Sequence, residues 1–205
     1  MNDQAKAVFD FWFQPGPGQP ADAPRREWFK KDDAFDRSIA DRFGAVIALA
    51  LAGGLRDWDA EGPQSQLARV LVLDQFTRNV HRGTPLAFAG DALALQAAQR
   101  MVDSGSGAHL ALPPLQRSFV YLPFEHAEDL AMQEQAVALY TRMDNDERDS
   151  APAATCKGIA GMLDYALRHR EVIRRFGRFP HRNAILGRAS TAEEEAYLRQ
   201  PGSGF

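Results

Sequence analysis

The clearest helical pattern in the sequence lies between Phe35 and Ala50, and it constrains the fold more than any other feature. Apolar residues recur there at three- and four-residue spacing, as on one face of an α-helix: Phe35, Ile39, Phe43, Val46, Ile47 and Ala50. Gly53 and Gly54 follow and predict the end of this helix. No alternation of polar and apolar residues bounded by hairpin turns stands out elsewhere. The sequence therefore favours an all-α protein with little sheet.

Helix signals recur along the chain and predict about eight to ten helices, packed as antiparallel helical hairpins or an irregular solenoid. The predicted helix starts are Asp3, Pro63, Asp91, Pro113, Pro123 and Pro152, and Ser190 and Thr191 form capping-box patterns with Glu193 and Glu194 before a last helix. Pro123 is expected to interrupt the preceding helix. Gly158 and Gly161 are expected to let another helix approach closely. Loops are expected from Pro15 to Pro24, at Ser104 to Gly107 and at Asp144 to Ser150.

Length and composition narrow the class of protein. At 205 residues and 22.7 kDa the chain is expected to form one domain, 1–205, with a core at about 8–198 and a frayed tail at 200–205. A net charge of −3 argues against a nucleic-acid partner. Cys156 is the single cysteine, which excludes an internal disulfide framework and favours a reducing compartment. With no signal peptide pattern and no apolar run long enough to span a bilayer, we expect a soluble, cytoplasmic protein.

The stretch from His169 to Gly187, here called the C-terminal corner, concentrates polar groups between apolar residues. Phe176 and Gly177 predict the end of a long helix, and Pro180 predicts a second, short helix that runs to Leu186. The turn between them gathers Arg174, Arg175, Arg178, His181, Arg182 and Asn183. A helix N-terminus with added guanidinium groups favours an anion or carboxylate site. Pairing of these arginines with acids of neighbouring helices is the alternative.

Two further polar clusters interrupt apolar segments. The Asp74 corner, Asp74 to Pro85, places Asp74 and Arg78 four residues apart on one helix face and adds Asn79 and Arg82. They form either an intrahelical ion pair or one wall of a shared cavity. The His126 corner, Pro123 to Asp129, holds Glu125 and His126 between apolar Phe124 and the next helix, so these two side chains are expected to face inward.

Three long motifs carry a resemblance to a known family. The runs VLDQFTRNVHRGTPLAFAGDALAL from Val72, YLPFEHAEDLAMQEQAVALY from Tyr121 and HREVIRRFGRFPHRNAILGRAS from His169, with VFDFWF near the N-terminus, resemble the uncharacterised bacterial family catalogued as domain of unknown function nine-two-four. The resemblance extends from Val8 to about Leu198. It implies an all-helical, tetratricopeptide-like fold and no established activity. The positions that match the family's motif residues are Asp74, Gln75, Arg78, Asn79, Arg82, His126, Asp129, Arg175, Phe176, Gly177, Arg178, Pro180, His181, Arg182 and Asn183. Thr77 stands where the family is expected to have proline, and Ala127 where it is expected to have serine.

The polar residues suggest three kinds of chemistry: metal binding, nucleophilic catalysis and general acid–base catalysis. A metal site would need ligands from three separate segments, because paired Glu-x-x-His motifs and a His-Glu-x-x-His helix are missing from the sequence. We therefore expect no metal and no cofactor. Nucleophilic catalysis by Cys156 is disfavoured, since a lone cysteine on a small-residue helix face usually serves packing. General acid or base work by His126, His181 or Glu125 near arginines remains open.

Three functional hypotheses follow. The first is a protein that holds a small anionic ligand, a phosphate or carboxylate, in an interhelical pocket, with or without enzymatic activity. Its predicted ligand-binding residues are Asp74, Arg78, Asn79, Arg82, Arg175, Arg178, Arg182 and Asn183, and its predicted catalytic residues are His126, His181 and Glu125. The second is an adaptor that clamps an acidic peptide of a partner in a helical groove. In the third, the corners are purely structural polar networks. A homodimer is compatible with all three.

Overall fold

The computed structural model describes residues 1–15, 18, 24–103, 105 and 107–204, and within them the fold is all-helical, with no strand. The α-helices follow in the order α1 (Asp3–Phe13), α2 (Asp33–Leu51), α3 (Pro63–Leu71), α4 (Thr77–Val80), α5 (Asp91–Asp103), α6 (Pro114–Glu125), α7 (Leu130–Glu147), α8 (Ala153–Phe176) and α9 (Ala192–Leu198). Single 3-10 turns lie at Arg26–Trp28, Arg56–Ala60, Pro85–Phe88, Ala108–Ala111 and Pro180–Arg182. The all-α prediction is confirmed, and the tetratricopeptide-like arrangement stays a prediction. Parts of the loops expected at 15–24 and 104–107 lie outside the described residues.

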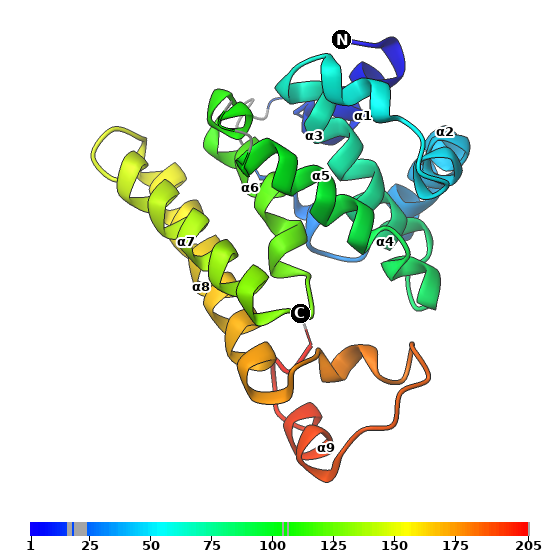
Figure 1. The fold of residues 1–205 in the computed structure, drawn as a ribbon, viewed down its shortest axis with the longest axis vertical. Helices are drawn as coiled ribbons and strands as arrows, with labels where there is room; N and C mark the ends of the chain where they lie inside the picture. Colours follow the sequence, from blue (N-terminus) through cyan, green and yellow to red (C-terminus); the bar gives the residue numbers. More distant parts are fainter. Residues whose placement is uncertain (16–17, 19–23, 104, 106, 205) are drawn as a thin grey trace.

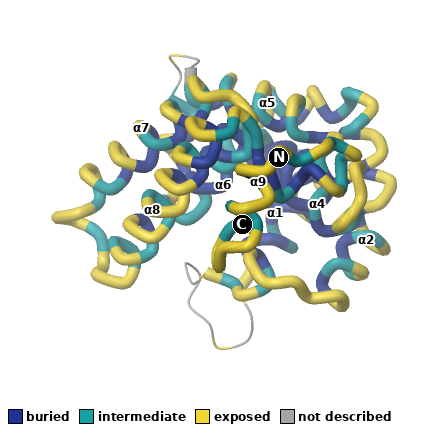
Figure 2. Tube along the Cα trace, turned by 90° about the horizontal axis from the view of Figure 1, so that it is seen from below, coloured by how far each residue is buried: buried dark blue, intermediate teal, exposed yellow. Residues whose placement is uncertain are grey.

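The helix formed by α3 and α4 is the centre of the molecule. α1, α2, α5 and α6 all pack against it, while α7 and α8 form an antiparallel hairpin at one side of that body (Figure 1). Trp12 of α1 contacts Phe76 and Phe119, with ring centroids 5.6 Å apart in both pairs. The tube in Figure 2 shows that the buried residues follow these inward faces. Burial of such large aromatic side chains is the main source of stability in a core of this kind.

Between α3 and α4 the helix widens into a π turn, Val72–Phe76. The N–H of Thr77 donates to the carbonyl of Val72, five residues back, and its hydroxyl donates to the same oxygen at 2.9 Å. A π turn adds one residue to a helix turn and rotates the side chains that follow it. Here it directs Asp74 and Gln75 into the interior, where both side chains are buried.

Gly90 lies against this π turn. A Cβ atom at position 90 would stand 2.1 Å from the carbonyl oxygen of Leu73, so only glycine fits. The close approach brings the first residue of α5, Asp91, next to the polar side chains that follow the π turn. Gly90 therefore sets the position of a carboxylate that the site uses.

Several predicted boundaries needed correction. α6 continues through Pro123 to Glu125, because a proline removes only its own N–H donor, and the His126 N–H still donates to Leu122 O at 2.8 Å. α7 accordingly begins at Leu130, not at Pro123, with Asp129 as its N-cap. α7 also extends to Glu147, which shortens the loop expected from Asp144 to Ser150.

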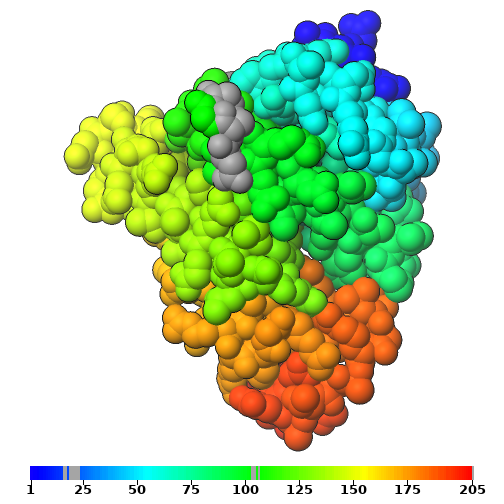
Figure 3. All heavy atoms as spheres, viewed as in Figure 1, coloured from blue at the N-terminus to red at the C-terminus, as the bar shows by residue number. Residues whose placement is uncertain are grey.

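The chain after α8 folds back over one end of the molecule. Gly177 ends α8 with a φ of 69°, as its position after Phe176 predicted. The short helix predicted from Pro180 to Leu186 is wrong in extent, since only Pro180–Arg182 forms a 3-10 turn. Thr191 and Glu194 form the capping box that opens α9. In Figure 3 this C-terminal segment, orange to red, covers the end of the molecule opposite the N-terminus.

We predict that Gly90→Ala lowers the free energy of unfolding by about 1–3 kcal/mol, the usual cost of forcing extra volume into a packed region. Urea unfolding followed by circular dichroism measures it. The matched control is Gly44→Ala on α2, where nothing lies within 4 Å of the added Cβ. At position 44 the better helix propensity of alanine is expected to raise the free energy of unfolding by about 0.5–1 kcal/mol. Equal effects at both positions would contradict the steric role of Gly90.

Candidate functional site

The candidate site is built around the buried carboxylate of Asp74, whose side chain is 1% exposed. Its Oδ1 lies 2.7 Å from His126 Nδ1 and 3.6 Å from Arg78 Nε, and its Oδ2 accepts a hydrogen bond from the Gln75 side-chain amide. Burial alone would raise the pKa of this carboxyl, but His126 and the Arg78 guanidinium hold it well below its usual range. Asp74 is therefore an anion at neutral pH, and its neighbours from two segments satisfy it.

His126 is held in one tautomer by this carboxylate. Burial, and then the charge of Arg78, lower the pKa of His126, so the imidazole is neutral at neutral pH. An ionised Asp74 only accepts hydrogen bonds, which assigns the imidazole proton to Nδ1 and leaves a lone pair on Nε2. The backbone is fixed as well, because Arg182 Nη2 donates to the carbonyl of His126 at 3.0 Å.

A second carboxylate–histidine pair lies beside the first. Glu125 Oε1 is 3.0 Å from Nδ1 of His169, which comes from α8, and both side chains are buried. The rings of His126 and His169 have centroids 6.5 Å apart. The end of α6 that presents Glu125 and His126 is capped by the fully buried Gln133, whose amide donates to the carbonyls of Glu125 at 2.6 Å and Ala127 at 2.8 Å. The orphan carbonyls of this helix end are thereby satisfied.

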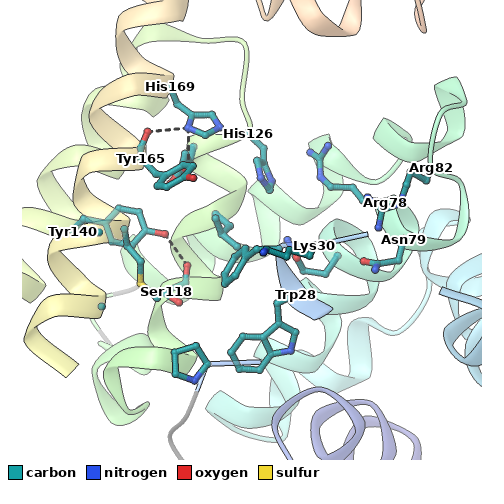
Figure 4. A pocket seen from close by; sticks show the side chains of 18 residues that line it. Trp28, Lys30, Arg78, Asn79, Arg82, Ser118, His126, Tyr140, Tyr165 and His169 are labelled. Carbon is teal, nitrogen blue, oxygen red and sulfur yellow. Dashed lines mark hydrogen bonds and ion pairs between the residues drawn. The ribbon is translucent and has the colours of Figure 1, made fainter. Parts of the chain in front are cut away.

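Both pairs face one cavity of about 530 Å³ (Figure 4). Its polar lining consists of Lys30, Gln75, Arg78, Asn79, Arg82, Ser118, Glu125, His126 and His169, and its remaining lining of Pro24, Trp28, Phe29, Leu122, Tyr140, Gly158, Gly161, Met162 and Tyr165. Phe29 and Tyr165 are 62% and 52% exposed, so the cavity opens to solvent between them. In Figure 4, Arg78, Asn79 and Arg82 face Tyr140, Tyr165 and His169 across the cavity, with Trp28 below.

The cationic side chains of the Asp74 corner are each paired on one edge. Arg78 Nη2 lies 2.7 Å from Asp91 Oδ1, and its guanidinium stacks over the Phe88 ring. Arg82 Nε lies 3.1 Å from Asp36 Oδ2, and Asn79 donates to Asp36 Oδ1 at 2.7 Å. Burial raises the pKa of Asp91. A guanidinium carries five N–H donors, so pairing on one edge leaves donors for a ligand.

The C-terminal corner divides into two parts. Arg182 contacts the site on the side away from the cavity. Its Nη1 lies 3.4 Å from Asp91 Oδ2, and its guanidinium lies over the rings of Phe88 and Phe179. Burial and the charge of Arg78 lower the pKa of Arg182 to about 10. The His181 ring lies beside Phe179, and burial together with Arg182 lowers the pKa of His181 to about 4. Neither His181 nor Arg182 is among the residues that line the cavity.

The remaining residues of this corner bind α9. Arg175 Nη2 lies 2.8 Å from Glu193, and Arg178 contacts both carboxylate oxygens of Glu194 at 2.7 and 2.8 Å. Asn183 donates to Ser190 and Glu194. Arg175 and Arg178 therefore pair with acidic side chains of α9, as the alternative interpretation of the corner predicted, and Asn183 hydrogen-bonds to one of the same carboxylates. The helix N-terminus on which the expected anion site depended is not formed, because the segment after Pro180 is a three-residue 3-10 turn.

Sequence reasoning did not identify the half of the cavity that comes from Trp28, Phe29 and α8. The sequence feature in this half of the cavity is the pair Gly158 and Gly161, which predicts close approach of another helix. That expectation was wrong, since a Cβ at either glycine would meet nothing within 4 Å, and both residues line the cavity. No group of three or more His, Cys, Asp or Glu that could hold a metal ion occurs among the described residues. No described helix is long and apolar enough to cross a membrane.

We predict that Glu194→Gln destabilises the protein at pH 7, and that its difference from the parent shrinks in acid. The hydrogen bond from Arg178 lowers the pKa of Glu194 from 4.5 to about 2. A carboxyl with a lowered folded-state pKa contributes stability above its unfolded value, and this is lost as pH falls from about 4.5 towards about 2. Thermal unfolding at pH 7, 4.5 and 3 measures the difference. Glu195→Gln, on the exposed face of α9, is the control and is expected to unfold like the parent.

Comparison with known proteins places the chain in a family. Residues 8–202 match the family described as bacterial protein of unknown function (DUF924). A solved structure of a protein of unknown function from Agrobacterium tumefaciens is 39% identical, covers 96% of this chain and 97% of its own, and superposes with a TM-score of 0.77. None of the curated proteins matches the chain. The chain belongs to the DUF924 family of bacterial proteins.

Proposed function

We propose that this protein binds a small organic anion, with a carboxylate head and an apolar body, in the cavity between the Asp74 corner and α8. The observation that carries the proposal is the composition of the cavity, which is cationic at one wall and aromatic or open at the other. Its volume of about 530 Å³ falls within the range typical of small-molecule pockets.

The cationic wall supports a carboxylate head. The lining holds three cationic side chains, Lys30, Arg78 and Arg82, against one carboxylate, Glu125. Arg82 uses Nε and Nη2 for Asp36, which leaves its Nη1 for a ligand. No ion pair joins Lys30 to any carboxylate within the described part of the chain. Asp74, Asp91 and Asp36 balance most of the charge of the two arginines, and the small remainder suits a singly charged carboxylate better than a multiply charged phosphate.

The opposite wall supports an apolar body. Trp28, Leu122, Tyr140 and Met162 present ring and aliphatic surface to the cavity. Gly158 and Gly161 leave open space where α8 passes, although glycine in a helix interior costs about 1 kcal/mol relative to alanine. Because no packing neighbour requires a glycine at either position, we ascribe both glycines to the space needed by a ligand.

The same features favour a small ligand over the acidic peptide of the adaptor hypothesis. The two arginines of the lining lie together on one wall of the cavity, whereas a groove for a peptide would distribute such side chains along several helices. The purely structural hypothesis accounts for Asp74, Arg182 and Arg178, whose contacts are made within the protein. It does not account for the cavity.

We predict that hexanoate and phenylacetate raise the melting temperature of the protein, whereas inorganic phosphate and acetate do so weakly. A ligand present at 100 times its Kd stabilises by about 2.7 kcal/mol. Arg82→Ala is expected to raise the Kd of hexanoate about tenfold, since a hydrogen bond to a charged group contributes about 1.5 kcal/mol or more. Arg148→Ala at the end of α7, also an exposed arginine paired with an aspartate, is the matched control. If both variants bind hexanoate like the parent, the head-group assignment is wrong.

A substitution that fills the cavity is expected to stabilise the protein and to weaken its binding of hexanoate. Gly158→Leu replaces a poor helix former by a good one, and its Cβ would meet nothing within 4 Å, so the melting temperature is expected to rise. The same side chain occupies ligand space, so hexanoate affinity is expected to fall by at least about tenfold. Gly44→Ala should raise stability and leave affinity unchanged. Unchanged hexanoate affinity in Gly158→Leu would remove α8 from the binding site.

A further inference from the structure

His126 and Arg78 are held side by side by one carboxylate oxygen. Asp74 Oδ1 lies 2.7 Å from the imidazole Nδ1 and 3.6 Å from the guanidinium Nε, and both residues also line the cavity. An imidazole and a guanidinium that share an oxygen on their inner sides present their outer sides to the same space. A proton acceptor and a cationic hydrogen-bond donor are thus preorganised next to each other.

The outer side of each group is available to a ligand. Nδ1 of His126 is occupied by Asp74, and its side chain is 17% exposed, so Nε2 is the nitrogen that a molecule in the cavity can reach. Arg78 uses Nη2 for Asp91 and Nε for Asp74, and no acceptor in the described ranges contacts its Nη1. The neutral state of His126 is the state that accepts a proton.

We propose that this cavity hydrolyses a carboxylic ester of an apolar acyl group, with His126 as general base and Arg78 as the group that stabilises the oxyanion. The inference rests on the proposed function, because the carboxylate bound there would be the product of the reaction.

The step balances without a further reactant. Nε2 of His126 takes a proton from water as the water oxygen forms a bond to the ester carbonyl carbon, and the carbonyl electron pair moves to oxygen, where Arg78 donates a hydrogen bond. When that pair returns, the bond from carbon to the alkoxy oxygen breaks, and this oxygen takes the proton from His126. The products are an alcohol and an acid, which ionises to the carboxylate.

Water is the nucleophile because no hydroxyl of the described lining residues is hydrogen-bonded to the imidazole of His126. Ser118 also lines the cavity, but its hydroxyl donates to the carbonyl of Leu115 in its own helix at 2.7 Å. The Thr77 hydroxyl likewise donates to the carbonyl of Val72. The exposed rim at Phe29 and Tyr165 lets water enter. Asp74 has the role of a positioning residue, since it fixes the tautomer of His126, contacts Arg78 and is not itself among the lining residues.

The test uses 4-nitrophenyl butanoate with the full-length protein and follows release of 4-nitrophenolate. We expect saturable hydrolysis by the parent, and a loss of at least about 100-fold in kcat in His126→Gln, the usual range for a general base. Hexanoate affinity should remain within about threefold in that variant. Asp74→Asn should lower kcat with KM unchanged, a split that a general loss of folding does not produce. kcat should be lower in D2O, since a proton moves in the rate-limiting step.

His81→Gln is the matched control, because His81 at the end of α4 is a partly exposed histidine with no ion pair to a described carboxylate. It should hydrolyse the ester like the parent. Equal rates in a folded His126→Gln variant and the parent would overturn the inference. No saturable hydrolysis by a parent that binds hexanoate would overturn it too and leave the proposed function standing. A parent that neither binds hexanoate nor hydrolyses the ester would overturn both.

Discussion

The buried charge of Asp74 is the constraint on which the rest of the structure depends. A carboxylate taken out of water costs several kcal/mol unless charges and hydrogen bonds surround it. Here the compensation comes from Gln75 and Arg78 in the same helix and from His126 at the end of α6. The contact with His126 therefore fixes the separation of two elements. The helix must widen at Val72–Phe76 to turn Asp74 inward, and α6 must end where His126 meets it.

Residues that do not line the cavity hold the site residues in place. Gln133 holds the end of α6 through its amide, and Arg182 holds the His126 carbonyl while contacting Asp91. Within the C-terminal corner, His169 lines the cavity directly, and Arg182 contributes to the site through the carbonyl of His126. Arg175 and Arg178 of that corner dock α9 instead. Residues that are close in sequence and alike in chemistry thus serve two different purposes, because the chain turns between them.

The fold could be predicted from sequence wherever a pattern is local. Helix spacing gave α2, and Gly177 marked the end of α8, since periodicity and left-handed caps depend on near neighbours. Pro123 misled because a proline near the end of a helix removes a single bond and need not stop it. The convergence of Asp74 with His126 was expected from their polar character in apolar surroundings. The opposite wall was not, because empty space between helices is a property of packing and leaves only an indirect signal, such as Gly158.

That indirect signal bears on whether the polar network is only structural. Buried ion pairs often contribute little net stability, and apolar replacements of equal volume are frequently as stable. Helix glycines without a close neighbour lower stability further. A chain selected for stability alone would have little reason to combine Asp74, His126 and an open space beside Gly158. The combination is consistent with a cavity that is kept open for a molecule, with its reactive nitrogen turned towards that molecule and its carboxylate turned away.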